Sequence, residues 1–193
     1  MHDLSPLTGL GARTPREDTI GAVVITEAPD WALASVTARA GEGHDCREIL
    51  ADLLGAPCPE VARHAQGPQH GAFWIGAESW MIEAPFDPAR DLALALRTVL
   101  GARASVTEQT DAWVRFDLSA PDLAPLLERL SNLDHAGMAP GTARRTVIDH
   151  MGCYLLRHAG HATIYAPRST ARSLHHAIVT AARSQQSGRA PRA

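Results

Sequence analysis

Residues 106–118 have the sequence VTEQTDAWVRFDL, in which apolar and polar side chains alternate. This period of two predicts a strand or a hairpin with one buried face. Residues 121–130, PDLAPLLERL, follow with a proline and an acid in the first turn and leucines at helical spacing. They predict a helix, which Asn132 closes.

The segment that follows predicts two more strands and a last helix. The strands cover residues 145–157 and 162–166 and are joined at Ala159-Gly160. The helix covers residues 169–183, with Ser169 as its N-cap and an apolar face made of Ala171, Leu174, Ile178 and Val179.

The N-terminal half carries the same kinds of signal. A helix over residues 89–100 is expected, with Asp87 as cap, Pro88 in the first turn and Gly101 as its stop. The other expected elements are strands 20–27 and 31–40, a helix 44–54 ended by Gly55, a loop 56–70, and a hairpin made of 71–76 and 79–84.

Hairpins therefore alternate with single helices along the chain. This order predicts an α+β fold with antiparallel sheet and helices packed on it, rather than a doubly wound parallel sheet. We expect an irregular N-terminal arm over residues 1–18, an α+β domain over 19–184, and a polar tail over 185–193. A division of the domain into subdomains 19–101 and 102–184 stays open.

Composition excludes several classes of function. The 193 residues are 45% hydrophobic, which suits a soluble core, and the net charge of -3 does not favour nucleic acid or an anionic membrane as a partner. We find no basic leader and no apolar run long enough to span a bilayer, so a cytoplasmic location is expected. All 18 basic residues are arginine, and this excludes Schiff-base and phosphate-loop lysines.

Neither metal nor redox chemistry is indicated. Cys46, Cys58 and Cys153 are odd in number and widely spaced, which predicts free thiols. His158 and His161 flank a tight turn and would be able to share a zinc ion, but a third ligand at a recognisable spacing is missing. The pair is better interpreted as a solvated turn.

Two further patterns resemble a cofactor-binding turn and acid-base pairs but do not predict a site. Residues 41–46, GEGHDC, begin like a dinucleotide-binding turn but lack the third glycine, so an ordinary turn before a helix is expected. The neighbouring pairs Asp134-His135 and Asp149-His150 would need a partner oriented in space, which adjacent residues rarely supply. We therefore expect no catalytic, cofactor-binding or metal-binding residue in this chain.

Several short motifs, in this order and spacing, resemble the gamma subunit of heterotetrameric sarcosine oxidase. The resemblance covers about residues 71–183 and departs from the family pattern at Ala120, His135 and Thr170. The motifs are GAE 76–78 with WMI 80–82, TEQTDAW 107–113, LSNLD 130–134, RRT 144–146, and PRS 167–169 with Ser173-Leu174.

The resemblance implies a fold similar to the folate-binding domains of aminomethyltransferases. It also implies an architectural subunit that packs on alpha, beta and delta subunits, which hold FAD, FMN, NAD, zinc and tetrahydrofolate. That complex demethylates sarcosine to glycine and forms hydrogen peroxide and methylenetetrahydrofolate. The subunit interface is expected to include Trp113, Asp134, Arg144, Arg168 and Ser169, where arginine forks at element ends suit acidic partners.

Two alternatives remain. One is the small subunit of an N-methylglutamate dehydrogenase type complex, which is built on similar subunits. The other is a free-standing folate-binding protein like a diminished aminomethyltransferase. An assembly subunit should expose a large apolar patch when it is alone, whereas a pocket lined by an acid and an arginine would favour folate binding.

Overall fold

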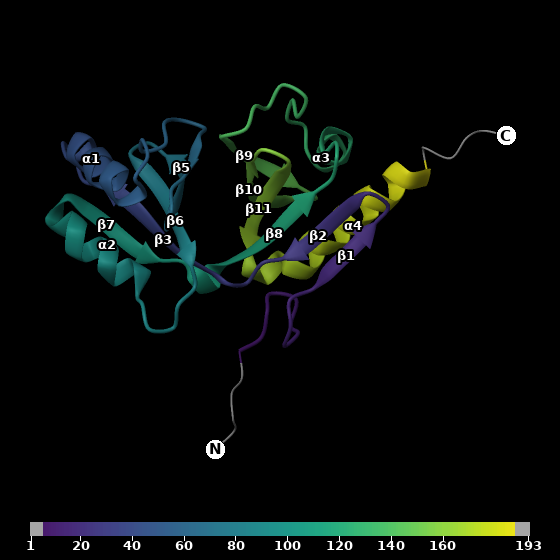
Figure 1. Cartoon of the computed structure of the whole chain (residues 1–193), viewed down its shortest axis with the longest axis horizontal. Coiled ribbons are helices and arrows are strands. Elements are labelled where there is room, and N and C mark those ends of the chain that lie inside the picture. The colour runs from purple at the N-terminus through teal and green to yellow at the C-terminus, as the bar shows by residue number, and fades with distance from the viewer. Residues whose placement is uncertain (1–5, 188–193) are drawn as a thin grey trace, which may run out of the picture. The chain divides into compact units, whose positions relative to one another are not determined.

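The computed structural model describes residues 6–187, which form two compact units (Figure 1). Unit 1 contains the chain up to Pro29, Ala112–Pro140, and the chain from Arg145 onward. Unit 2 contains Asp30–Asp111 and Gly141–Arg144. The units thus differ from the sequence halves 19–101 and 102–184, because the first two strands join the C-terminal half of the chain.

Unit 1 is built on a six-stranded sheet in the order β1-β2-β8-β11-β10-β9. The register of β8 and β11 is antiparallel, from Trp113 opposite Pro167 to Ser119 opposite His161. The strands are β1 Glu17–Ile20, β2 Val23–Glu27, β8 Trp113–Ser119, β9 Thr142–Ile148, β10 Met151–Arg157 and β11 His161–Pro167, and the helices are α3 Ala124–Leu130 and α4 Ala171–Ser187.

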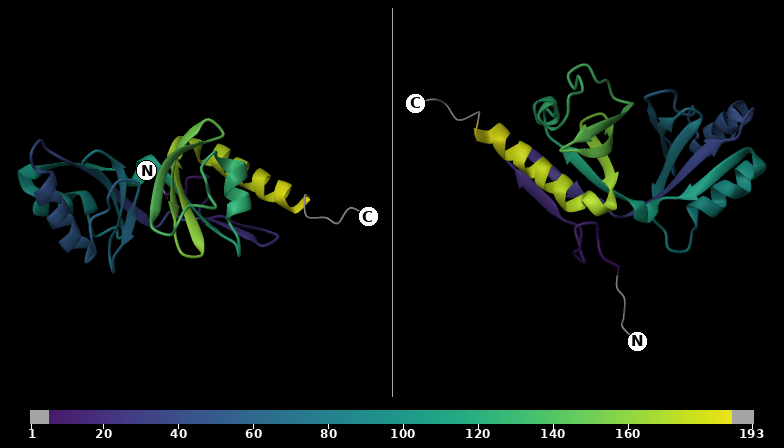
Figure 2. Two further views of the ribbon diagram at one scale, coloured as in Figure 1. Left: turned by 90° about the horizontal axis from the view of Figure 1, so that it is seen from above. Right: turned by 180° about the vertical axis from the view of Figure 1, so that it is seen from behind.

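Both helices of unit 1 pack on the same face of this sheet. Alternate residues of β8, such as Val114, Phe116 and Leu118, point into one apolar core with residues of α3 and α4. Leu126 of α3 and Leu174 of α4 are completely buried in it. The two further views in Figure 2 show α4 running along this sheet. Period-two strands and 3.6-period helices thus share one buried layer.

Unit 2 has a five-stranded sheet in the order β4-β5-β6-β3-β7, and each pair of neighbouring strands is antiparallel. The core of unit 2 lies between one face of this sheet and two helices, and Trp80, Leu50 and Leu96 are fully buried in it. The strands are β3 Trp31–Ala38, β4 His64–Gln66, β5 Gly71–Gly76, β6 Ser79–Pro85 and β7 Ala104–Glu108, and the helices are α1 Gly43–Leu54 and α2 Leu92–Leu100.

The structure confirms the predicted α+β class with antiparallel sheet. It also confirms the β5–β6 hairpin and the helix at residues 44–54, which begins at Gly43 and ends where Gly55 takes the left-handed conformation (φ 64°). Glycine has no Cβ to oppose that conformation, so the carbonyls at the end of the helix can bond to the amide of Gly55.

The structure differs from several of the predicted strands and from one predicted loop. The strand expected over 20–27 is broken by a turn at Gly21 (φ 59°), which makes β1 and β2 a hairpin. The alternating run 106–118 is neither one strand nor a hairpin, because β7 and β8 belong to different sheets and a 3-10 turn at Thr110–Ala112 separates them. The expected loop 56–70 contains the short strand β4.

The strand expected over 145–157 is also two strands, β9 and β10. Asp149 (φ 46°) and His150 (φ 69°) form the turn between them, and both have positive φ. This is the backbone of a two-residue hairpin turn, which glycine and asparagine usually occupy. Asp149 and His150 are therefore turn residues rather than an acid and base pair.

Three helices begin later than expected. The helix expected from residue 89 begins at Leu92, and Asp91 rather than Asp87 caps it. The helix expected from 121 begins at Ala124. Ser169 lies within a 3-10 turn at Arg168–Thr170 rather than at the cap of α4.

The ends of the described chain differ from the expected arm and tail. Residues 17 and 18 of the expected arm belong to β1, and residues 185–187 of the expected tail belong to α4. Residues 6–16 contain no helix or strand, and residues 1–5 and 188–193 lie outside the described residues. Between residues 6 and 187, no helix combines the length and hydrophobicity that crossing a membrane requires.

Candidate functional site

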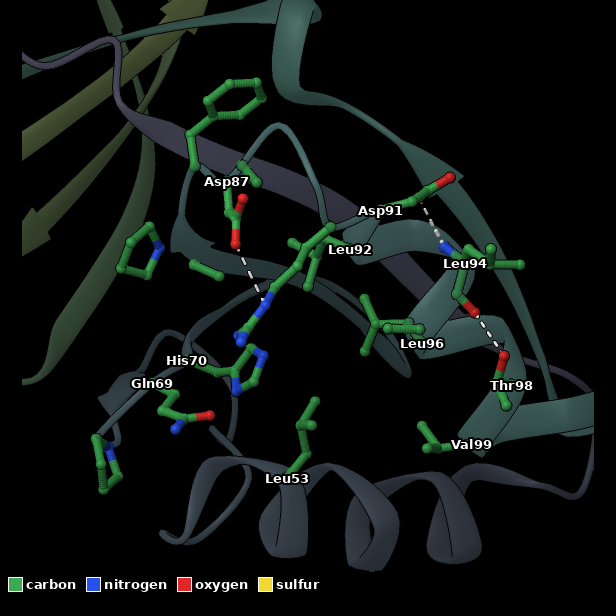
Figure 3. A pocket seen from close by; sticks show the side chains of 17 residues that line it. Leu53, Gln69, His70, Asp87, Asp91, Leu92, Leu94, Leu96, Thr98 and Val99 are labelled. Atoms are coloured by element: carbon green, nitrogen blue, oxygen red, sulfur yellow. Dashed lines mark hydrogen bonds and ion pairs between the residues drawn. The ribbon is translucent and has the colours of Figure 1, made fainter.

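A groove of about 820 Å³ opens in unit 2 beside α2, and we call it the α2 groove (Figure 3). Its floor comes from Ala32 of β3 and from Ala84 and Pro85 of β6. One wall is α2 itself, and the other combines Leu53 of α1 with residues 68–70. The volume falls within the usual range for binding sites, and the lining is mostly apolar.

Helix α2 turns apolar side chains to two sides. Ala93, Leu96 and Leu100 are buried in the unit 2 core. Leu94 and Val99 line the groove, with 56% and 49% of their surface exposed, and the buried Leu96 lines it as well. The helix is fixed at its start by Asp91, whose Oδ1 accepts a 2.8 Å hydrogen bond from the Leu94 amide. This N-cap sets where the outward face begins.

The loop between β6 and α2 places opposite charges on the rim. The Arg90 guanidinium lies 3.3 Å from a carboxylate oxygen of Asp87. Asp87 also accepts a 2.9 Å hydrogen bond from the Ala89 amide, which fixes the loop. Phe86, in the same loop, is 50% exposed and lines the groove. The rim thus offers two carboxylates, Asp87 and Asp91, and one guanidinium.

The opposite wall depends on a glycine. A Cβ on Gly67 would overlap the backbone carbonyl of Leu54, so only glycine lets the loop pass so close to the end of α1. The Gly67 amide donates a 2.8 Å hydrogen bond to the His70 carbonyl, which closes a turn. This turn holds Gln69 and His70 against the groove.

His70 is the only histidine that lines the groove within the described residues. Burial lowers the pKa of His70 from its ordinary value, and the positive charge of Arg90 adds to that effect, while a hydrogen bond with the Leu53 backbone opposes it. The ring is therefore neutral at neutral pH. The groove therefore offers a bound molecule apolar contacts, a neutral imidazole and a charged rim.

The residues predicted for a subunit interface come from several segments of the chain. Trp113 is half-buried against Tyr154, with ring centroids 5.5 Å apart. It lies opposite Pro167 in the sheet, so Arg168 and Ser169 follow close to it. Asp134 lies in the loop after α3 and accepts a hydrogen bond from Gly137. Arg144 is exposed but belongs to unit 2. The interface role of these residues stays a prediction.

The His158 and His161 rings stack in parallel, with centroids 4.2 Å apart. Within residues 6–187, no group of three or more His, Cys, Asp or Glu is placed to hold a metal ion. The three cysteines are free, as predicted, and burial raises the pKa of Cys58 and of Cys153 to about 11. These thiols are protonated at neutral pH and are poor nucleophiles.

The glycine-rich turn at residues 41–46 packs on protein rather than facing an open site. A Cβ on Gly43 would meet the carboxylate of Glu78 in the β5–β6 turn. Glu78 is also paired with Arg47 at 2.6 Å, one turn into α1. The space where a pyrophosphate would lie against the backbone therefore contains an acidic side chain, which agrees with an ordinary turn.

Sequence reasoning missed the α2 groove, because its lining comes from five separate segments of the chain. One signal was present: in Leu92–Leu100, LALALRTVL, only Arg97 and Thr98 are polar. A helix that is apolar on nearly all sides has a second face to bury. Val99 belongs to that second face.

Comparison with solved structures shows two informative likenesses. One is to a chain of the heterotetrameric sarcosine oxidase from Corynebacterium sp. U-96, solved in complex with pyrrole 2-carboxylate, with a TM-score of 0.72, 20% identity, and 86% of each chain covered. The other is to the glycine cleavage system aminomethyltransferase T from Bartonella henselae, with a TM-score of 0.59 and 15% identity.

The second likeness covers 81% of this chain but only 48% of the aminomethyltransferase, so the present chain spans about half the length of that enzyme. No protein-family model matches the sequence, and no curated protein matches it either. At these identities the likenesses establish the fold alone, and they confirm the predicted likeness in fold to an aminomethyltransferase.

Proposed function

We propose that this chain is the gamma subunit of a heterotetrameric sarcosine oxidase and serves to assemble the complex. The observation that carries the proposal is the reciprocal coverage: this chain and one chain of the Corynebacterium oxidase match over 86% of both. The match to the aminomethyltransferase covers only 48% of that enzyme.

The α2 groove also supports an assembly role. Exposed apolar side chains gathered in one place mark surfaces that bind other molecules. In the proposed complex the alpha, beta and delta subunits would hold FAD, FMN, NAD, zinc and tetrahydrofolate, and they would carry out the oxidation of sarcosine. The cytoplasmic location expected from the sequence suits such a complex.

A pull-down of the tagged chain from its native cells tests this proposal. The expected result is co-purification of a yellow flavoprotein that releases peroxide when sarcosine is added. If the co-purified complex oxidises N-methylglutamate instead of sarcosine, the chain is better assigned as the small subunit of an N-methylglutamate dehydrogenase type complex. Recovery of the chain alone and colourless would contradict both.

One observation favours the second candidate, a free-standing folate-binding protein. The α2 groove is lined by both acids and an arginine, Asp87, Asp91 and Arg90. A carboxylate can accept hydrogen bonds from the N–H groups of a pteridine ring, and a guanidinium can bind the carboxylates at the other end of folate. This candidate predicts that the purified chain binds tetrahydrofolate in calorimetry and that Arg90→Gln weakens binding about tenfold.

A further inference from the structure

Exposed apolar side chains concentrate in the α2 groove. Six large hydrophobic residues are exposed among the described residues, and three of them, Phe86, Leu94 and Val99, line this groove. The other three are scattered at Leu7, Val61 and Val147. Single exposed residues of this kind are ordinary, whereas a contiguous set rimmed by charge indicates a contact surface.

The groove side of α2 is suited to packing against another helix. Leu94, Ala95, Thr98 and Val99 are exposed there, at spacings of one, four and five residues. Leu94 and Thr98 are four residues apart, as are Ala95 and Val99, so they form two adjacent ridges along the helix. Such ridges fit the grooves of a facing helix. Arg97 is not among the groove residues, so this side of α2 carries no charge beyond Asp91.

The floor of the groove excludes an added strand. Ala32 of β3 and Ala84 of β6 are partners in register, and β3 is also paired with β7 on its other side. Both strands are interior in the sheet, so the floor has no free backbone edge for an extended peptide. A segment that enters must satisfy its own backbone hydrogen bonds, as an α-helix does.

The rim selects the charge of that helix. Asp87 and Asp91 carry two negative charges, against the single positive charge of Arg90. His70 adds none, because burial keeps its ring neutral at neutral pH. A lysine or arginine on the incoming helix would meet this net negative rim.

We propose that the α2 groove is the docking site for an amphipathic helix of a partner protein. Leucine-like side chains of that helix lie between α2 and the wall at Leu53, and a basic residue lies over Asp87 and Asp91. The inference rests on the proposed function only in taking this partner to be a subunit of the oxidase complex. The outward side of α2 is about 12 Å long, which matches two to three turns of the partner.

Photo-crosslinking in the native cells tests this placement. A photoreactive phenylalanine at residue 94 is expected to crosslink to one segment of another protein. That segment, when sequenced, should have apolar residues at helical spacing and at least one lysine or arginine. The matched control is the same probe at residue 61, where Val61 is 69% exposed in the same unit but lies outside the groove. It should not crosslink to that segment.

Substitutions provide a second readout. In a pull-down without the photoreactive probe, Leu94→Asp should lower the amount of this partner that co-purifies with the chain at least tenfold. Loss of a central apolar contact has an effect of this size. Ala95→Arg, which places a bulky cation on the same side, should do the same. Val61→Asp should leave recovery unchanged. Arg90→Gln should raise recovery two- to threefold, because it removes the one charge that repels a basic helix.

The outcomes separate this inference from the proposed function. If the crosslinked partner is an amphipathic basic helix of a protein that does not co-purify with any flavoprotein, the docking site stands and the oxidase proposal fails. No crosslink at residue 94, a crosslink to a second copy of this chain, or unchanged recovery with Leu94→Asp would overturn the docking site. So would tetrahydrofolate that fills the groove and loses affinity with Arg90→Gln.

Discussion

Glu27 is a buried carboxylate, 2% exposed at the end of β2. Its two oxygens accept hydrogen bonds from the amides of Leu10 (2.9 Å) and Arg16 (3.2 Å). The Thr8 and Ala12 backbones close a further turn within the same segment. The irregular arm expected from the sequence is thus tied to unit 1 over residues 8–16, through a residue that composition alone would place on the surface.

Glu27→Gln should release this segment. The neutral amide keeps the shape of the side chain but loses the charge-assisted hydrogen bonds, so we expect a loss of about 2 kcal/mol in the free energy of unfolding. Hydrogen exchange at the Leu10 amide should become faster. Glu17→Gln, in the exposed neighbouring strand, is the control. Unchanged protection at Leu10 would show that Glu27 does not hold the segment.

Asp18 and His175 connect β1 to α4 at 2.7 Å, and Arg16 pairs with the same carboxylate. The hydrogen bond from Arg16, with a smaller contribution from His175, lowers the pKa of Asp18 from 3.8 to about 2, although partial burial opposes the change. Because the folded pKa lies below the unfolded one, the resulting stabilisation is complete above about pH 4 and is lost as pH falls toward 2.

Asp18→Asn should therefore lower the free energy of unfolding by about 1 kcal/mol at pH 7, a value reduced by the solvent around this partly exposed pair. The difference from the wild type should close between pH 4 and pH 2. Urea titrations across this range provide the measurement, with the exposed Asp45→Asn as control. A difference that stays constant with pH would exclude an ionic origin.

At the scale of elements, the start of α2 distinguishes the sequence prediction from the structure. The Asp91 carboxylate accepts from the Leu94 amide, which is the geometry of an N-cap, whereas Asp87 accepts from Ala89 within the preceding turn. Sequence reasoning favoured Asp87 because Pro88 follows it, and proline is common in the first turn of a helix.

Asp91→Ala should cost about 1 kcal/mol of stability through loss of the cap, and Asp87→Ala should cost less than half of that. Amide exchange within residues 92–96 should increase in the first variant alone. Thermal unfolding of both variants gives the comparison. Equal losses, or a larger loss with Asp87→Ala, would show that the helix begins earlier.

Element prediction succeeded where local chemistry is sufficient. Helix α1 has leucines at helical spacing and a glycine at its end, and β5 and β6 flank a short turn. It failed at β9 and β10, because a two-residue turn at Asp149 and His150 preserves the alternation on both sides and contains no glycine. It failed at β7 and β8 because polar and apolar residues keep alternating where the chain passes from one sheet to the other.

The α2 groove lay beyond such reasoning for a related reason. Ala32, Leu53, His70 and Ala84 come together only through the pairing of β3 with β6 and the packing of helices on them. Only the α2 part of the groove could be recognised from the sequence, because its residues are nearly all apolar and lie in one segment. That signal indicates a second contact face, but it does not say what occupies it.

In the chain as a whole, two separate cores account for the α+β fold. They also explain why the two units do not coincide with residues 19–101 and 102–184. Each sheet buries one face under two helices, as the alternation of hairpins and helices predicted. The chain enters unit 2 at Asp30 and leaves it near Asp111, so unit 1 is built from both ends of the sequence. Pairing of β2 with β8 brings those ends together, and only long-range contacts determine it.

We propose that this chain works as one subunit of a larger oxidase. Native mass spectrometry of material purified through a tag on this chain tests that role. We expect one copy of the 20.6 kDa chain in a flavin-containing complex with three different partners, and loss of those partners with Leu94→Asp but not with Val61→Asp. A single species of 20.6 kDa, without flavin or partner, would contradict it.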